Sequence, residues 1–265
     1  MTTTGTPESS VEGRLPRHPG PDATTVLGKA VLVLRAFTTE DRGVTLAELG
    51  RRTGLAKGTL HRVCGDLVGA GMLERRDGHY RLGRLMFELG MRASVERDLL
   101  EVATPFLEEL RAAVDETVHL GVRDGTEVVY VAKLVGHRQT AAPSRAGGRW
   151  GLSCTAVGKA LLAHAPAEVL DEVVRAGLTR HTARTVTAPG ILAGQLEQVR
   201  RTGVAFEFEE SRTGVVCVGA PVFDSRGEAV AAVSVAGPVT RFRPQAGADR
   251  VRAAARGISA TLARG

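Results

Sequence analysis

Residues 45–82 contain two short helical segments joined at a glycine and then a tight hairpin, and this order constrains the fold more than any other feature of the chain. Thr45 stands three residues before Glu48, and this spacing predicts a capping box at the start of a helix that Gly54 ends. Further on, Asp77-Gly78 lies between two extended runs, which predicts a two-residue hairpin turn. Two helices meeting at a short glycine turn, followed by a β-ribbon, predict a winged helix-turn-helix.

The second helix of this motif is predicted over residues 56–71, and its two faces differ in chemistry. Leu60, Val63 and Leu67 recur at helical spacing and predict a buried stripe. The opposite stripe is cationic, since residues 51–65 include four basic side chains and no acidic one. Such a surface favours a polyanionic partner, and the net charge of +6 for the whole chain points the same way, although weakly.

These basic positions form a predicted DNA interface. A helix-turn-helix places its second helix in the major groove, so we expect Lys57, His61 and Arg62 near base edges and the flanking side chains on phosphates. The predicted DNA-binding residues are Arg51, Arg52, Lys57, Gly58, Thr59, His61 and Arg62, with Arg75, Arg76 and Arg81 on the wing. The alternative interpretation is a solvated cationic face that binds nothing.

The rest of the chain predicts a second, α+β domain reached through linker helices. Helical patterns cover residues 85–97 and 99–114, and the sequence pattern after residue 115 is typical of β-strands. Expected strands cover residues 117–122, 127–134, 204–209, 215–223 and 229–236, and expected helices cover residues 155–177, 191–202 and 245–263. Strands joined by short turns and interspersed with helices favour an antiparallel sheet with packed helices.

Composition excludes several other classes of protein. The three cysteines lie far apart without metal-ligand spacing, so neither disulfides nor a zinc site is expected, and a reducing cytoplasm fits best. Residues 1–23 are rich in Thr, Pro and Gly without an apolar block, which predicts a disordered tail rather than a signal peptide. No apolar run reaches the length of a membrane span. We expect no cofactor and no bound metal.

Three stretches of the sequence resemble the IclR-type bacterial transcriptional regulators. They are residues 45–62 with 78–83, residues 144–160, and residues 203–210 with 214–221 and 232–238. A helix-turn-helix alone is weak evidence of a family, whereas all three stretches in order and at similar spacing are specific. The resemblance extends from about Thr24 to the C-terminus.

This resemblance implies a GAF-like effector-binding domain, a homodimer or homotetramer, and promoter DNA as the partner. Carried over position by position, it implies an effector pocket formed by Trp150, Ala156, Val157, Glu207, Val215, Cys217, Ser234 and Ala236. Gly58 stands where the family commonly has Ser, which removes a phosphate-binding hydroxyl from the DNA-binding helix. In the pocket, Gly151 replaces a common Pro, and Glu207 and Ala236 occupy positions that are Asp and Ser in some members, so the effector of a relative does not transfer. Without the resemblance, Cys217 could equally be a small buried hydrophobe, and Glu207 could be a solvated strand residue.

Together these features predict a DNA-binding transcriptional repressor modulated by a small metabolite. Its expected divisions are a tail over 1–23, a winged helix-turn-helix over 24–84, a linker helix over 85–98 and an effector domain over 99–265. No enzyme is expected, because Gly158-Lys159 lacks the glycine and the hydroxyl of a phosphate loop, and Ser234 lacks the first glycine of a nucleophile elbow. The alternative is a small-molecule sensor or hydrolase-like domain whose winged helix binds protein.

Overall fold

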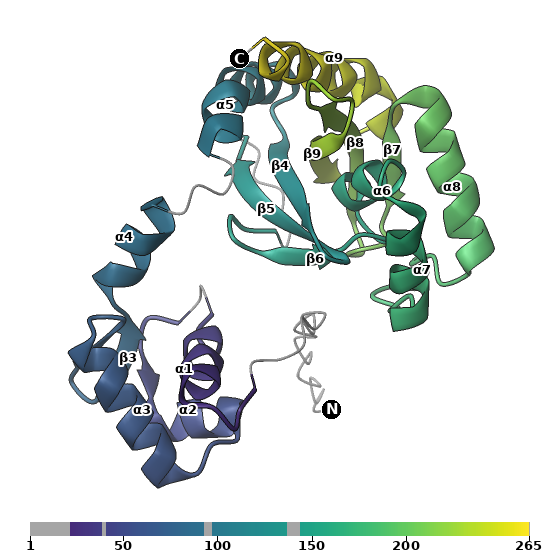
Figure 1. Cartoon of the computed structure of the whole chain (residues 1–265). Coiled ribbons are helices and arrows are strands. Elements are labelled where there is room, and N and C mark those ends of the chain that lie inside the picture. Colours follow the sequence, from purple (N-terminus) through teal and green to yellow (C-terminus); the bar gives the residue numbers. More distant parts are fainter. Residues whose placement is uncertain (1–21, 39–40, 93–96, 137–143, 265) are drawn as a thin grey trace, which may run out of the picture. The chain divides into compact units, whose positions relative to one another are not determined.

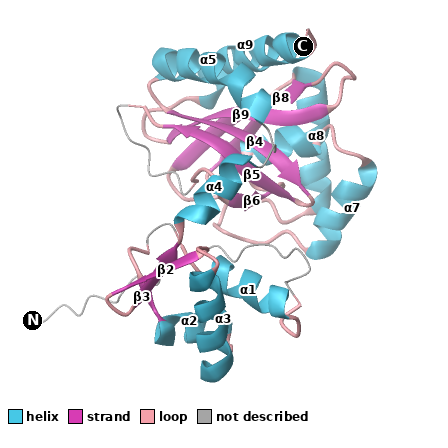
Figure 2. Cartoon of the chain, turned by 60° about the vertical axis from the view of Figure 1, so that its left-hand side comes forward, coloured by secondary structure: helices cyan, strands magenta, loops and turns pink. Residues whose placement is uncertain are grey.

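The computed structural model describes residues 22–38, 41–92, 97–136 and 144–264, and these fall into two compact units (Figures 1 and 2). The N-terminal unit is a small helical domain with a three-stranded sheet of order β1-β3-β2. Its elements are α1 (Val26–Arg35), β1 (Val44–Thr45), α2 (Leu46–Thr53), α3 (Lys57–Gly69), β2 (Leu73–Arg76), β3 (His79–Leu82) and α4 (Arg84–Arg92).

Local sequence signals explain this unit. Thr45 caps α2, since its Oγ1 accepts from the Glu48 amide at 3.2 Å, and α2 ends at Gly54. Asp77 and Gly78 both adopt positive φ, 49° and 76°, as a two-residue hairpin turn requires. The apolar stripe of α3 is buried against α1, α2 and the hairpin. The winged helix-turn-helix predicted from these signals is therefore confirmed.

The C-terminal unit contains a six-stranded antiparallel sheet of order β6-β5-β4-β9-β8-β7, covered by helices on both faces (Figure 1). Its helices are α5 (Arg97–Val114), α6 (Ala156–Leu162), α7 (Ala167–Ala176), α8 (Pro189–Thr202) and α9 (Pro244–Leu262). Its strands are β4 (Thr117–Asp124), β5 (Glu127–Leu134), β6 (Arg149–Gly151), β7 (Ala205–Phe208), β8 (Val215–Phe223) and β9 (Ala229–Pro238).

The two faces of this sheet bury different cores. Helices α5 and α9 pack on the face formed by residues such as Val118, Val218 and Val235. On the opposite face α6 lies very close to the strands, and Gly219 makes this approach possible, because a Cβ there would meet backbone atoms of Ala156 at 3.0 Å. The α+β architecture expected for this half of the chain is confirmed.

One predicted element was wrong. The single helix expected over residues 155–177 is two helices, α6 and α7, separated at residues 163–166. Pro166 explains the break, because proline supplies no amide hydrogen and its ring clashes with the preceding turn of a continuing helix. The short strands β1 and β6 also lacked a sequence signal long enough to predict them.

Candidate functional sites

The exposed face of α3 carries the predicted base-contacting residues. Lys57, His61 and Arg62 are exposed, whereas Leu60 and Val63 on the opposite stripe are buried. Gly58 is also exposed and Thr59 is half-buried. The helix begins after Ala56, which offers no capping side chain, so the amides of its first turn have no side-chain partner at the N-cap. Helix α3 thus presents a cationic ridge with a positive dipole end.

The arginines at the end of α2 have internal partners. Arg52 pairs with Asp41 at 2.6 Å and with Glu48 at 2.8 Å, and it donates to the Ala36 carbonyl at 2.9 Å. This arrangement lowers the pKa of Asp41 to about 2, mainly through the hydrogen bond from Arg52. Arg51 pairs with Glu48 but stays largely exposed. Arg52 therefore ties α2 to the end of α1, a contact that sequence spacing did not indicate.

The wing carries its three predicted arginines on β2 and β3. All three are exposed, and the Arg75 guanidinium lies 5.6 Å from the centre of the Tyr80 ring, which is buried. Arg76 approaches Glu74 at 3.9 Å. Arg75 is thus positioned by a cation–π contact, while Arg76 and Arg81 project from either side of the hairpin turn.

A second site lies in the C-terminal unit, where side chains from the sheet and α6 enclose a cavity of about 20 Å³. Its walls are His119, Tyr130, Ser144, Trp150, Thr155, Ala156, Val157, Ser211, Val215, Cys217, Ser234 and Ala236. This volume corresponds to roughly one water molecule. A metabolite therefore requires the walls to move apart.

Strand register explains why these residues share one face. His119 on β4 pairs with Ser234 on β9, and two residues along each strand a second row crosses the sheet. That row consists of Thr117, Ala236, Cys217 and Glu207, on β4, β9, β8 and β7 respectively. Because side chains alternate between faces along a strand, both rows point toward α6.

The His119 side chain is a buried, neutral member of the cavity wall. Its Nε2 lies 2.6 Å from the Ser144 hydroxyl, and its ring lies 5.1 Å from that of Tyr130. Burial, reinforced by the positive charge of Lys133, lowers the pKa of His119 to about 3. At neutral pH the ring is thus an uncharged hydrogen-bonding group and a weak base.

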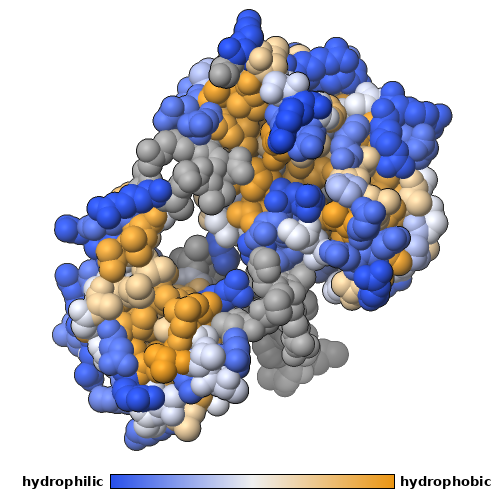
Figure 3. Space-filling view, viewed as in Figure 1, coloured by the Kyte–Doolittle hydropathy of each residue, from blue (hydrophilic) through white to orange (hydrophobic). Residues whose placement is uncertain are grey.

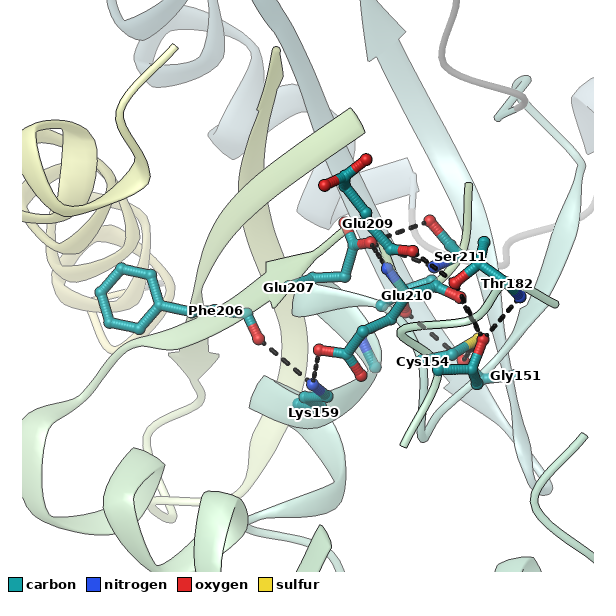
Figure 4. Close-up of polar contacts among 12 residues, drawn as sticks. Gly151, Cys154, Lys159, Thr182, Phe206, Glu207, Glu209, Glu210 and Ser211 are labelled. Atoms are coloured by element: carbon teal, nitrogen blue, oxygen red, sulfur yellow. Dashed lines mark hydrogen bonds and ion pairs between the residues drawn. The ribbon is translucent and has the colours of Figure 1, made fainter. Parts of the chain in front are cut away.

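Glu207 lies behind the cavity wall, completely buried (Figure 4). Its Oε1 accepts hydrogen bonds from the Glu210 amide at 2.6 Å, the Ser211 amide at 3.0 Å and the Ser211 hydroxyl at 3.3 Å. Among the described residues, its Oε2 has no hydrogen-bond partner of normal geometry. Burial raises the pKa of Glu207, although the neighbouring Cys217 thiol and these amides partly oppose the shift.

A buried ion pair lies beside Glu207. Lys159 on α6 is only 1% exposed, and its Nζ donates to Glu210 Oε1 at 2.5 Å and to the Phe206 carbonyl at 3.3 Å (Figure 4). Desolvating two charges is costly, so such a pair persists only where its geometry is well determined.

Comparisons with known proteins place this architecture in a family. The profile described as "Bacterial transcriptional regulator IclR C-terminal" matches residues 91–260, and the profile "IclR helix-turn-helix domain" matches residues 26–77. The chain belongs to the IclR family. It is therefore a DNA-binding transcriptional regulator with an N-terminal helix-turn-helix and a C-terminal ligand-binding domain.

Individual IclR-family proteins are similar over nearly the whole chain. The regulator BhcR of Paracoccus denitrificans is 36% identical, covering 83% of this chain and 81% of its own. KdgR of Escherichia coli is 33% identical over 91% and 94%. Among solved structures, an IclR homologue from Microbacterium hydrocarbonoxydans complexed with 4-hydroxybenzoate has a TM-score of 0.84 at 31% identity, covering 91% of this chain and 100% of that one.

Within this IclR-type fold the structure brings together all the predicted effector residues except Glu207 at one cavity. Sequence reasoning missed His119, Tyr130, Ser144, Thr155 and Ser211, which also line it. His119 and Tyr130 lie on β4 and β5, outside the three stretches that carry the resemblance, so no local motif marked them. Ser144 opens the second of those stretches, but it was not among the positions carried over. Thr155 and Ser211 lie beside predicted residues, and their N-cap and turn positions were usable signals.

The described part of this IclR-family chain contains no cluster of three or more residues suited to a metal ion. None of its described helices combines the length and apolar character needed to cross a bilayer.

Proposed function

We propose that this regulator is a cytoplasmic repressor that binds promoter DNA through α3 and the wing. In this proposal a metabolite bound in the C-terminal cavity modulates DNA binding. The observation that carries the proposal is the exposed cationic face of α3 beside an arginine-bearing hairpin. Lys57, His61 and Arg62 read bases, while Arg51 and the wing arginines contact phosphates. Arg52 contributes chiefly by holding α2 in place.

The effector cavity is small and uncharged at its surface, so it suits a compact organic metabolite. Aromatic walls at Trp150 and Tyr130 and hydroxyls at Ser144, Thr155 and Ser234 supply stacking and hydrogen bonds. A Klebsiella pneumoniae relative that is 30% identical is named a repressor, AllR, which supports repression here. Binding need change operator affinity by only about 1–3 kcal/mol to alter transcription severalfold.

A homodimer completes this proposal. Apolar side chains are exposed on α1 and α4 of the N-terminal unit, notably Leu27 at 74% and Phe87 at 69%, and Figure 3 shows hydrophobic residues at the surface of this unit. Contiguous exposed apolar surface marks protein–protein contact. We divide the chain accordingly into a tail (1–23), a DNA-binding domain (24–84), a linker helix (85–98) and an effector domain (99–265).

Fluorescence anisotropy with labelled DNA from the region upstream of the gene that encodes this protein tests the proposed function. Replacing Lys57→Ala together with Arg62→Ala removes two groove contacts and weakens operator binding about hundredfold. Arg226→Ala is the matched control, because Arg226 is an exposed arginine of the C-terminal unit. Equal affinity for wild type and the double variant, or wild-type affinity independent of salt, contradicts the proposal.

Trp150 provides the matching test of the cavity, since it is the single tryptophan of the chain and lines the wall. A metabolite screen followed by Trp150 fluorescence should identify a ligand that also shifts operator affinity. A ligand that shifts operator affinity but leaves Trp150 fluorescence unchanged, and that tolerates Ser234→Ala and Cys217→Ala, binds elsewhere.

A further inference from the structure

Residues 209–214 form a connection between β7 and β8 that closes one side of the cavity. Ser211 contributes to the wall, and Val215 continues it on β8. The backbone enters this connection at Glu209 with a φ of 58° and leaves it at Gly214 with a φ of 82°. Positive φ at a residue other than glycine is unfavourable and persists only when the surroundings hold it.

Hydrogen bonds from two neighbouring segments hold this connection. Glu207 accepts from the amides of Glu210 and Ser211, as described above. Thr182 donates to the Glu209 carbonyl at 2.6 Å, and Thr185 donates to the Glu210 carbonyl at 2.7 Å. These bonds fix the backbone of the segment to β7 and to the loop before α8.

Within the part of the chain that the structure describes, the ion pair between Lys159 and Glu210 also connects this segment to α6. The α6 helix carries Ala156 and Val157 of the opposite cavity wall. The Lys159–Glu210 pair thus joins two walls that must separate for the cavity to admit a ligand larger than about one water. A buried pair of this kind does not by itself stabilise a fold, since apolar residues of the same volume often serve as well.

We propose that Lys159 is a positioning residue of the effector cavity, holding residues 209–214 closed against α6 through Glu210 without touching the ligand. This inference rests on the proposed function, in which the cavity takes the effector. Breaking the pair opens the wall locally while the sheet and its α5–α9 core stay folded.

The competing explanation is that Lys159 only adds to global stability. Two thiols distinguish the explanations. Cys154 is 1% exposed and lies beside the segment (Figure 4). Cys217 lines the cavity from β8 and is the strand partner of Glu207 on β7. Burial raises the pKa of both thiols, and the Lys159 charge lowers it. Removing this charge would therefore slow thiol chemistry, so faster reaction requires greater exposure.

The experiment is alkylation of the full-length protein by iodoacetamide, with the rate at each cysteine followed by mass spectrometry. Lys159→Met should accelerate the reaction of Cys154 and Cys217 about tenfold, because an uncompensated buried Glu210 favours the open wall. Cys64, buried in the N-terminal unit, is the internal reference and should not change. The double variant Lys159→Met with Glu210→Met leaves no unpaired charge, so it should react at close to the wild-type rate, as expected if Lys159 acts through Glu210.

A destabilised control completes the design. Leu107→Ala removes a buried side chain of α5 on the opposite face of the sheet. Unchanged or slower alkylation in Lys159→Met, undiminished acceleration in the double variant, or the same acceleration in Leu107→Ala would overturn the inference. The assay needs no effector, so a failure of the proposed function, in which no metabolite alters operator binding, leaves its outcome readable.

Discussion

The two units handle charge in opposite ways. In the N-terminal unit Lys57 and Arg62, the cations proposed to contact DNA, are exposed to solvent on α3. In the C-terminal unit His119, Glu207 and Lys159 are withdrawn from solvent, next to a cavity of about 20 Å³. Exposed positive charges attract a polyanion over a distance of several ångströms, and dissolved salt weakens this attraction. Buried polar groups are barely screened, and their protonation is linked to the stability of the fold.

This contrast explains how one chain can bind two very different partners. In the proposed function the α3 surface meets a charged duplex without rearrangement, because its side chains are already solvated. In the proposed function the cavity must open before a ligand enters, and the ligand must replace the hydrogen bonds that the cavity walls make with one another. Selectivity for a small molecule therefore resides in the C-terminal unit, and long-range attraction to DNA resides in the N-terminal unit.

The largest expected effect that sharpens this comparison is acid sensitivity of the buried site. With its pKa lowered from 6.5 to about 3, neutral His119 contributes stability that is complete above pH 6.5 and is lost as pH falls toward 3. Between pH 7 and pH 4, wild type should lose about 3 kcal/mol more unfolding free energy than His119→Gln. Urea unfolding followed by Trp150 fluorescence measures this, because Trp150 reports the C-terminal unit.

The control for that experiment is His61→Gln in the exposed face of α3. This substitution should leave the acid sensitivity of the C-terminal unit unchanged. Equal acid losses in wild type and His119→Gln would show that the His119 ring is not held neutral by burial, and the contrast between the units would weaken.

A smaller effect tests the close packing of α6 on the sheet. Gly219→Ala adds a methyl group 3.0 Å from backbone atoms of Ala156 and should destabilise the C-terminal unit by about 1–3 kcal/mol. The same urea titration detects the loss. Gly194→Ala on α8, where nothing lies within 4 Å, is the control. A Gly219→Ala protein as stable as wild type would mean that α6 moves away from the sheet without cost.

The smallest effect has the opposite sign and belongs to the exposed surface. Gly65 lies within α3 with open space around it, so Gly65→Ala should stabilise the helix by about 0.5–1 kcal/mol. Hydrogen exchange of the α3 amides measures the change. Reduced protection would indicate that this face is more constrained than its exposure suggests.

Local signals predicted the N-terminal unit well because each acts within a few residues. Thr45 caps α2 from one residue away, and Asp77-Gly78 forms a turn whose geometry depends on its own backbone. Pro166 is also a local signal, and its effect on the backbone outweighs the apolar spacing that predicts a single helix across it. Pairing partners were less visible, since the spacing of Arg52 gave no sign of Asp41.

By itself the sequence determined the order and type of the main elements, the cationic stripe of α3 and the alternation that turns one face of each strand inward. Only the tertiary structure decided which inward residues meet. His119 lies beside Ser234 because β4 pairs with β9 across more than a hundred residues, and Lys159 became a buried cation because α6 packs toward Glu210. Periodicity is a property of neighbouring residues, whereas strand order and desolvation depend on how distant segments pack.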